Sequence, residues 1–144
     1  MTRLSWQNIC LPTILLLIML FPRLGLGQDG FAAKATGGRG GKTVTVHTPE
    51  EFTKMLKLDE PLLIEVSGTL AIGSVAMASN KTLIGTGKNP TLIGNLYLRS
   101  GATNIILRNL TFTNPMNKKG KGGGDGVTIR GGKMVWIDHC TFVD

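Results

Sequence analysis

Short runs of alternating apolar and polar residues follow one another along the chain from about residue 61 to its end. Glycine or asparagine separates most of these runs. Strict alternation over a few residues is typical of a β-strand with one buried face, and glycine and asparagine favour tight turns. The pattern therefore predicts an all-β domain of short strands. The expected strands cover residues 62–66, 81–84, 91–93, 96–99, 104–108, 111–112, 127–129 and 134–137.

Similar strand centres recur at Ile64, Ile84, Leu107 and Ile129, which are 20, 23 and 22 positions apart. A period of about 22 residues with several short strands in each favours a parallel β-helix. A β-sandwich, in which turn signals come every ~8–12 residues, is the alternative. In a β-helix like residues stack inside the coils. The predicted core is Ile84, Ile93, Leu107, Ile129, Val135 and Ile137, with Phe112, Cys140 and Phe142 near a turn.

One stretch has helical spacing instead. Thr48 is a capping residue, with proline directly after it and glutamate three residues on, which is a helix start. The apolar residues that then share one helix face are Phe52, Met55 and Leu56. Residues 59–61 end the helix. We expect it to cover one open end of the β structure, which would otherwise offer unpaired strand groups.

The first 27 residues are expected to be a signal peptide, which leaves residues 28–144 as the mature domain. Arg3 gives a positive start, an apolar run covers residues 14–21, and small residues precede a cleavage site before Gln28. The apolar stretch is shorter than the ~20 residues that a membrane span needs. We therefore expect a secreted, extracellular protein with no membrane attachment after cleavage.

The whole chain carries a formal net charge of +7, and the expected mature domain has 14 basic against 9 acidic residues, which is +5. A basic excess favours a polyanionic partner. Charge alone does not choose among nucleic acid, anionic lipid and acidic polysaccharide.

Residues 30–41 are rich in glycine and lead into Gly41-Lys42-Thr43, which ends like a phosphate-binding loop. Such a loop needs a glycine five positions before Gly41, where this chain has Thr36, and it opens a helix. Residues 42–46 instead alternate like a strand. Nucleotide binding is excluded here.

Two further features depend on export. Cys10 lies in the expected signal peptide, so Cys140 is the single thiol of the mature domain and no internal disulfide can form. Such a thiol is either buried as a small apolar residue or free to meet a partner. Asn80 and Asn109 begin N-glycosylation sequons, and asparagines at β-helix turns also serve backbone hydrogen bonding.

Candidate chemistry gathers between residues 114 and 142. Residues 114–124 break the strand rhythm with lysines and glycines, and Lys118, Lys119 and Lys121 are candidates for binding a polyanion. Asp125 comes next and is a candidate Ca²⁺ ligand, one of the six to eight oxygen ligands that this ion takes. An aspartate before glycine is also a common turn residue.

Asp138 and His139 follow the last long run. Neighbouring residues on a strand point to opposite faces, so we do not expect the pair to orient the imidazole as a general base, and we prefer a structural role in the turn. Two interpretations of residues 127–137 are open. They form a hairpin across the Gly131-Gly132 turn, or they are consecutive faces of one coil.

Residues 135–142 resemble the Trp-Ile-Asp-His signature of the pectate lyase family. Residues 124–129, whose Asp125 stands 13 positions before Asp138, are similar to the acidic block that precedes this signature in the family. The resemblance runs from about residue 30 to residue 144 and matches the N-terminal part of such a domain. It implies a right-handed parallel β-helix with an N-terminal capping helix, here partial and truncated at the C-terminal end.

The resemblance also implies an enzyme that cleaves α-1,4-linked polygalacturonate by β-elimination and that needs calcium. It implies that Asp125 is one of the calcium ligands. The family often carries a second acid two residues earlier, where this chain has Gly123. The other acidic ligands and the arginine that abstracts the proton lie on later coils, beyond Asp144. We therefore assign no catalytic residue in this chain and expect little or no lyase activity from it. The expected partner is acidic polysaccharide rather than nucleic acid, and the expected state is a monomer.

Two other functions are open. A catalytically silent polysaccharide-binding or structural solenoid would suit the basic loop and an incomplete metal site. A pectin lyase would act on methyl-esterified chains without metal, and Asp125 counts against it.

Overall fold

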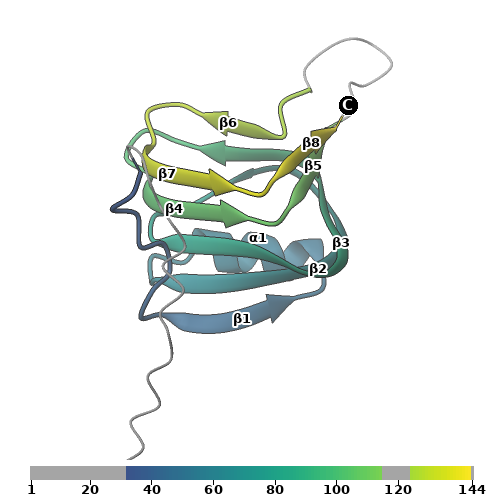
Figure 1. The fold of residues 1–144 in the computed structure, drawn as a ribbon, viewed down its shortest axis with the longest axis horizontal. Helices are drawn as coiled ribbons and strands as arrows, with labels where there is room; N and C mark the ends of the chain where they lie inside the picture. The colour runs from purple at the N-terminus through teal and green to yellow at the C-terminus, as the bar shows by residue number, and fades with distance from the viewer. Residues whose placement is uncertain (1–31, 115–123, 144) are drawn as a thin grey trace, which may run out of the picture.

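The computed structural model describes residues 32–114 and 124–143 as one stack of coils (Figure 1). The expected signal peptide and the lysines Lys118, Lys119 and Lys121 lie outside the described residues. The elements in chain order are β1 (Lys42–Val46), α1 (Pro49–Lys57), β2 (Leu62–Ala76), β3 (Lys81–Leu98), β4 (Thr103–Arg108), β5 (Thr111–Thr113), β6 (Val127–Ile129), β7 (Lys133–Asp138) and β8 (Thr141–Val143).

Each strand pairs in parallel with the strand of the neighbouring coil. β6 pairs with β3 and β7 pairs with β4, so these two strands do not pair with each other. The prediction of a parallel β-helix is confirmed, and the hairpin and β-sandwich alternatives are wrong. Figure 1 shows the result as a stack that runs from β1 at one end to β6, β7 and β8 at the other.

The coils have three sides, each a ladder of parallel strands. The first side joins β1, the N-terminal parts of β2 and β3, then β4 and β7. The second joins the middle of β2 and β3 with β5 and β8. The third joins the C-terminal parts of β2 and β3 with β6. Side chains on each side therefore line up from coil to coil, inward and outward.

Inward-facing residues stack to form the core. Ile64, Leu83 and Leu107 occupy one column and are fully buried, at 0 % exposure each. Fully burying such a side chain is worth ~1.5–3 kcal/mol. Leu107 and Phe112, both expected in the core, are confirmed there.

The predictions for Ile84 and Ile93 are wrong by one position. Both are only partly buried, whereas their neighbours Leu83 and Leu92 are fully buried. β3 holds two adjacent aliphatic residues at both places, so alternation predicts only that one of each pair faces inward. The stacking of the coils decides which one it is.

The expected period also needs correction at the last coil. Ile129 pairs with Leu98 rather than with Leu107. The true partner of Leu107 in the next coil is Ile137, 30 positions later, whereas Ile64, Leu83 and Leu107 are 19 and 24 positions apart. The segment between β5 and β6 makes this coil longer than the others.

The last coil turns its apolar residues inward, but no described residue packs over them. Ile129, Ile137 and Phe142 are 45 %, 41 % and 53 % exposed. Their prediction as core residues is therefore wrong in this structure, although Phe142 does stack on Phe112 with 5.2 Å between ring centroids. Val135 is partly buried against the core.

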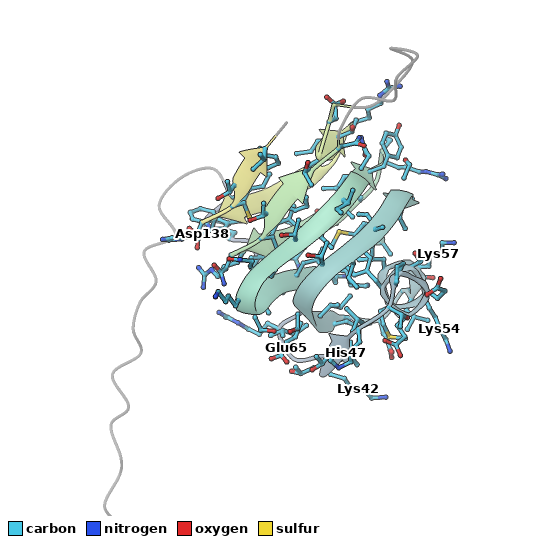
Figure 2. All side chains as sticks on the ribbon, turned by 90° about the vertical axis from the view of Figure 1, so that its right-hand side faces the viewer. Lys42, His47, Lys54, Lys57, Glu65 and Asp138 are labelled. Carbon is cyan, nitrogen blue, oxygen red and sulfur yellow. The ribbon has the colours of Figure 1, made fainter. Side chains whose placement is uncertain are left out.

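Helix α1 forms as expected. The Thr48 side chain accepts a hydrogen bond from the Glu51 backbone N–H at 3.2 Å, and the Glu51 carboxylate accepts one from the Thr48 backbone N–H at 3.3 Å. Phe52 and Leu56 are fully buried in the core beside β1 and β2. The opposite face carries lysines that project into solvent (Figure 2). No helix among the described residues is long and apolar enough to cross a membrane.

Asparagines hold the turns between coils. Asn104 has a positive φ of 59°. Its side-chain oxygen accepts hydrogen bonds from the backbone N–H groups of Thr36 and Gly37 at 2.7 and 2.8 Å, and its amide donates to the Asn80 side chain at 2.8 Å. Asn109 donates to the Gly85 carbonyl at 2.7 Å. Backbone hydrogen bonding by a sequon asparagine is confirmed for Asn109, whereas the Asn80 side chain accepts from the side chain of Asn104. Glycosylation of both stays a prediction.

Candidate functional site

Asp125 stands directly before β6, where the chain returns to the third side of the coils. Its carboxylate is exposed, and its Oδ2 accepts a hydrogen bond from the Thr128 hydroxyl at 3.2 Å. Its backbone oxygen accepts one from the Asn114 side chain at 2.9 Å, and Gly124 N–H donates to the Asn114 carbonyl. The two ends of the segment between β5 and β6 are therefore joined by hydrogen bonds beside the exposed carboxylate of Asp125.

Polar side chains of the neighbouring coil adjoin Thr128, the hydroxyl donor to Asp125. Asn95 donates from its side-chain amide to the Thr128 hydroxyl at 2.7 Å. Tyr97 is the register partner of Thr128, so both project outward from the third side. The Asn95 side-chain oxygen is buried and has no hydrogen-bond partner among the described residues. Thr128 thus links the carboxylate of one coil to the polar surface of the coil below.

The described residues supply one anionic ligand for calcium at this place. No group of three or more histidine, cysteine, aspartate or glutamate side chains gathers anywhere in the part of the chain that the structure describes. Calcium takes six to eight oxygens from several segments. Asp125, with the Thr128 hydroxyl beside it, fits as one ligand of several and does not form a site alone. Gly123, where the family often has its second acid, lies outside the described residues.

Asp138 and His139 lie on the first side of the coils, away from Asp125. His139 has a positive φ of 51°, so its ring folds back and Nδ1 lies 2.5 Å from Oδ1 of Asp138. The expectation that the two side chains point apart is therefore wrong, because His139 belongs to the turn rather than to the strand. Figure 2 shows Asp138 on the opposite side of the coils from α1.

The other oxygen of Asp138 ties two coils together. Arg108, its register partner in the previous coil, donates from Nε and Nη2 to Oδ2 at 2.7 and 2.6 Å. Burial acts to raise the pKa of Asp138, but the hydrogen bonds from His139 and Arg108 outweigh it and hold the pKa below its ordinary value. Both carboxylate oxygens are engaged within the protein, which agrees with a structural role.

The comparisons with known proteins agree with this fold. The sequence model of the family described as pectate lyase matches residues 9–144. The chain belongs to the pectate lyase family.

Relatives in this family carry two different names. A pectin lyase of Pectobacterium carotovorum is 33 % identical over 86 % of this chain and 42 % of its own length. A pectin lyase of Pseudomonas marginalis is 37 % identical over 87 % of this chain and 42 % of its own. A pectate lyase of Emericella nidulans is 38 % identical over 73 % of this chain and 31 % of its own length. The chain thus spans less than half the length of these relatives.

Solved structures show the same architecture. A variant of the Bacillus subtilis pectate lyase superposes with a TM-score of 0.64 at 21 % identity, over 79 % of this chain and 48 % of that one. A polygalacturonate lyase fused to a self-assembling amphipathic peptide gives a TM-score of 0.67 at 22 % identity. The match covers 81 % of this chain and 48 % of that one. At this identity the likeness shows the fold alone, and it confirms the parallel β-helix of the pectate lyase family.

Sequence reasoning missed Thr128, which donates to Asp125, and it missed Asn95 and Tyr97, which adjoin Thr128 from the neighbouring coil. Tyr97 and Thr128 lie in runs that were expected to be strands, whereas Asn95 lies between two expected runs and proves to be part of β3. The outward orientation of Asn95 and Tyr97 could be read from alternation with the buried residues Leu96 and Leu98. Their closeness to Thr128 could not, because it depends on which coil β6 joins. Lys118, Lys119 and Lys121, the expected binding lysines, lie outside the described residues.

Cys140 is half-buried and packs against the core of this pectate lyase coil. Its Sγ donates to the Asp138 carbonyl at 3.4 Å. Burial raises the pKa of the Cys140 thiol, with smaller opposing contributions from hydrogen bonds to Leu110 and Asp138. The packing favours the buried alternative over a thiol that waits for a partner.

Cys140 is expected to react slowly with disulfide reagents in the native protein, because the thiolate is the reacting form. In a Cys10→Ser chain at neutral pH, we expect its rate to be at least about tenfold below that of the same chain unfolded in urea. The measurement is the release of coloured thiolate over time. Ser67→Cys in a chain without other cysteines supplies an exposed control, and equal rates for the two native thiols would contradict the prediction.

Proposed function

We propose that this chain is part of an exported lyase that cleaves acidic pectic polysaccharide by β-elimination. The family match over residues 9–144 carries the proposal. The exposed Asp125 supports it, because this carboxylate stands where the acidic block of the family is expected and is free to meet a ligand. The net charge of +5 on the expected mature domain suits a polyanionic substrate.

β-Elimination on a uronate breaks two bonds and forms one double bond. A base removes the proton at C5, which is acidic because it lies next to the carboxyl group. The electron pair left on C5 forms the C4–C5 double bond, the C4–O bond breaks, and the departing oxygen takes up a proton. The role we propose for the described residues is to bind and orient the uronate, and the base is assigned to none of them.

Asp125 is the residue that we propose as a calcium ligand. Its Oδ2 is held by one hydroxyl donor from Thr128, and its other oxygen has no hydrogen-bond partner among the described residues. A bound cation would neutralise the uronate carboxylate and so make the C5 proton more acidic. With one protein carboxylate at this place, we expect weak calcium affinity that depends on carboxylates of the substrate to complete the coordination.

Pectin lyase activity on methyl-esterified chains is the second candidate. Two of the relatives named above are pectin lyases, and they match this chain over a greater share of its length than the pectate lyase does. A methyl ester has no charge, so binding to esterified pectin would need neither calcium nor Asp125. The two candidates therefore differ in one measurable property, the dependence on calcium.

The test measures binding and cleavage by the 144-residue chain with polygalacturonate and with highly esterified pectin, with calcium or with chelator. We expect calcium to strengthen binding to polygalacturonate, and Asp125→Asn to weaken the calcium-supported binding roughly tenfold, the effect of losing one charged ligand. Asp59→Asn, an exposed aspartate far along the chain, is the matched control. Release of unsaturated uronides, followed by their ultraviolet absorbance, is expected to be low.

Three outcomes would contradict parts of this proposal. Calcium-independent cleavage of esterified pectin would select the pectin lyase candidate. Calcium-insensitive binding of polygalacturonate without any product, also in a longer form of the protein, would select a non-catalytic binding protein. Rapid calcium-dependent product release by the 144-residue chain would refute the expectation of low activity.

A further inference from the structure

Two arginines from different coils converge on Tyr97. The guanidinium carbon of Arg99 and that of Arg130 each lie 6.0 Å from the centre of the Tyr97 ring. Cation–π attraction acts over this distance. Tyr97 is also the only tyrosine of the chain, and it lies on the third side of the coils, as Asp125 does.

The register explains why the two arginines reach the same ring. Leu98 and Ile129 are the last paired residues of β3 and β6, and Arg130 N–H donates to the Leu98 carbonyl at 2.8 Å. Arg99 and Arg130 therefore follow this pair on neighbouring coils. Like charges placed side by side on adjacent strands are destabilising, so an anion between them would relieve a repulsion that the fold itself creates.

No protein carboxylate provides that anion in the part of the chain that the structure describes. The salt bridges found there all involve Asp138, on another side of the coils. Arg99 and Arg130 are both exposed, and Tyr97 is partly buried. Two exposed guanidinium groups thus stand beside one aromatic ring, with no carboxylate of the described residues paired to either of them.

We infer that Tyr97, Arg99 and Arg130 form a subsite for the carboxylate of one uronate unit, an inference that rests on the acidic substrate proposed above. Arginine presents a planar fork that matches a carboxylate with two parallel hydrogen bonds. Contact with Tyr97 restricts both arginine side chains in the free protein. The entropy that they lose when a ligand binds is therefore smaller. The subsite recognises the free acid, and it is separate from the anionic Asp125.

The single tyrosine makes the test site-specific. The 144-residue chain is titrated with an oligogalacturonate, and the ring signals of Tyr97 are followed by NMR. We expect these signals to shift with a saturable dependence on ligand, and the fully methyl-esterified oligomer to produce no such shift. Arg99→Gln and Arg130→Gln are each expected to weaken binding about tenfold, which corresponds to about 1.4 kcal/mol.

Two controls separate a built subsite from general charge. Arg39→Gln removes the same charge from an exposed arginine in the N-terminal segment and is expected to change the affinity less than twofold. Arg99→Lys keeps the positive charge but loses the planar guanidinium that can form two parallel hydrogen bonds with a carboxylate. We expect its affinity to lie between those of the wild type and Arg99→Gln. Equal losses for Arg39→Gln and Arg99→Gln, or full recovery with lysine, would overturn the subsite.

The same titration distinguishes this inference from the proposed function. Binding or cleavage of polygalacturonate without any shift of Tyr97 would overturn the subsite and leave the lyase proposal standing. A specific Tyr97 shift in a protein that releases no unsaturated product in any form would support the subsite and overturn the lyase proposal. Absence of both binding and shift would overturn the two together.

Discussion

Replacing Lys81 with methionine is expected to lower the free energy of unfolding by about 2–4 kcal/mol. Lys81 has no solvent exposure, and its Nζ donates to the carbonyl oxygens of Leu58, Glu60 and Ser79 at 2.7, 2.8 and 2.8 Å. Methionine fills a similar volume but leaves three partly buried acceptors without this donor, and an unsatisfied buried group costs about 1–3 kcal/mol before the loop relaxes.

The effect should be structural rather than electrostatic. Burial lowers the pKa of Lys81, while Asp59 and Glu60 nearby act to raise it. The ammonium group is thus costly to bury, and its three hydrogen bonds offset that cost. Two of the acceptors lie in the connection from α1 to β2, so the variant should loosen this connection first.

Urea unfolding followed by circular dichroism measures the change. Lys88→Met is the matched control, because Lys88 is an exposed lysine of the same strand and such surface changes are usually within about 0.5 kcal/mol. If the two variants unfold at the same urea concentration, the three hydrogen bonds of Lys81 contribute nothing and the prediction fails.

Replacing Asp138 with asparagine is expected to lower stability at neutral pH by about 1–2 kcal/mol. The variant loses the charge that Arg108 contacts through two nitrogens, at a place where the two side chains are 23 % and 20 % exposed. It also weakens the contact with His139 in the following turn. These contacts join β4 to β7, so the last complete coil should separate more readily.

The pH dependence follows from the lowered pKa of Asp138. The carboxyl binds its proton less readily in the folded chain than in the unfolded chain, where its ordinary pKa is 3.8. Its contribution is therefore fully present above that value and is lost as the pH falls through the lower, folded pKa. The wild-type chain and Asp138→Asn should differ at pH 7 and become alike in strong acid.

Urea midpoints at several pH values test this second prediction. Glu50→Gln, an exposed acid in the first turn of α1, is the control for a general loss of negative charge. A stability difference between wild type and Asp138→Asn that persists unchanged into strong acid would show that packing, and not the ionised carboxylate, is responsible.

The helix shows how far local signals reach. Its cap, its buried face and its end were all predicted, because a capping box and helical spacing act within a few residues. Most of the short strands were predicted for the same reason, but residues 67–76 of β2 were not, and three expected runs proved to be one strand, β3. Sequence alone did not distinguish Leu83 from Ile84, since two adjacent aliphatic residues satisfy either orientation of the strand.

The candidate site divides in the same way. Asp125 was found because it stands in a recognisable stretch of sequence, and family membership followed from that stretch. Tyr97, Arg99 and Arg130 were not found as a group. Arg130 is about 30 positions from the other two along the chain, and no sequence pattern indicates that β6 pairs with β3. The unexpected contact of His139 with Asp138 depends on a left-handed backbone that histidine adopts rarely, at a position where Asn109 stands in the preceding coil.

The sequence by itself determined the strand-rich composition, the capped helix and the family of this protein, since these depend on neighbours along the chain. The tertiary structure alone decided which residues meet across coils. In a parallel β-helix each strand pairs with one about 19 to 31 positions away, and the length of the intervening turns sets that distance. Register is therefore chosen by the packing of inward side chains, and the outward neighbours of Asp125 follow from it.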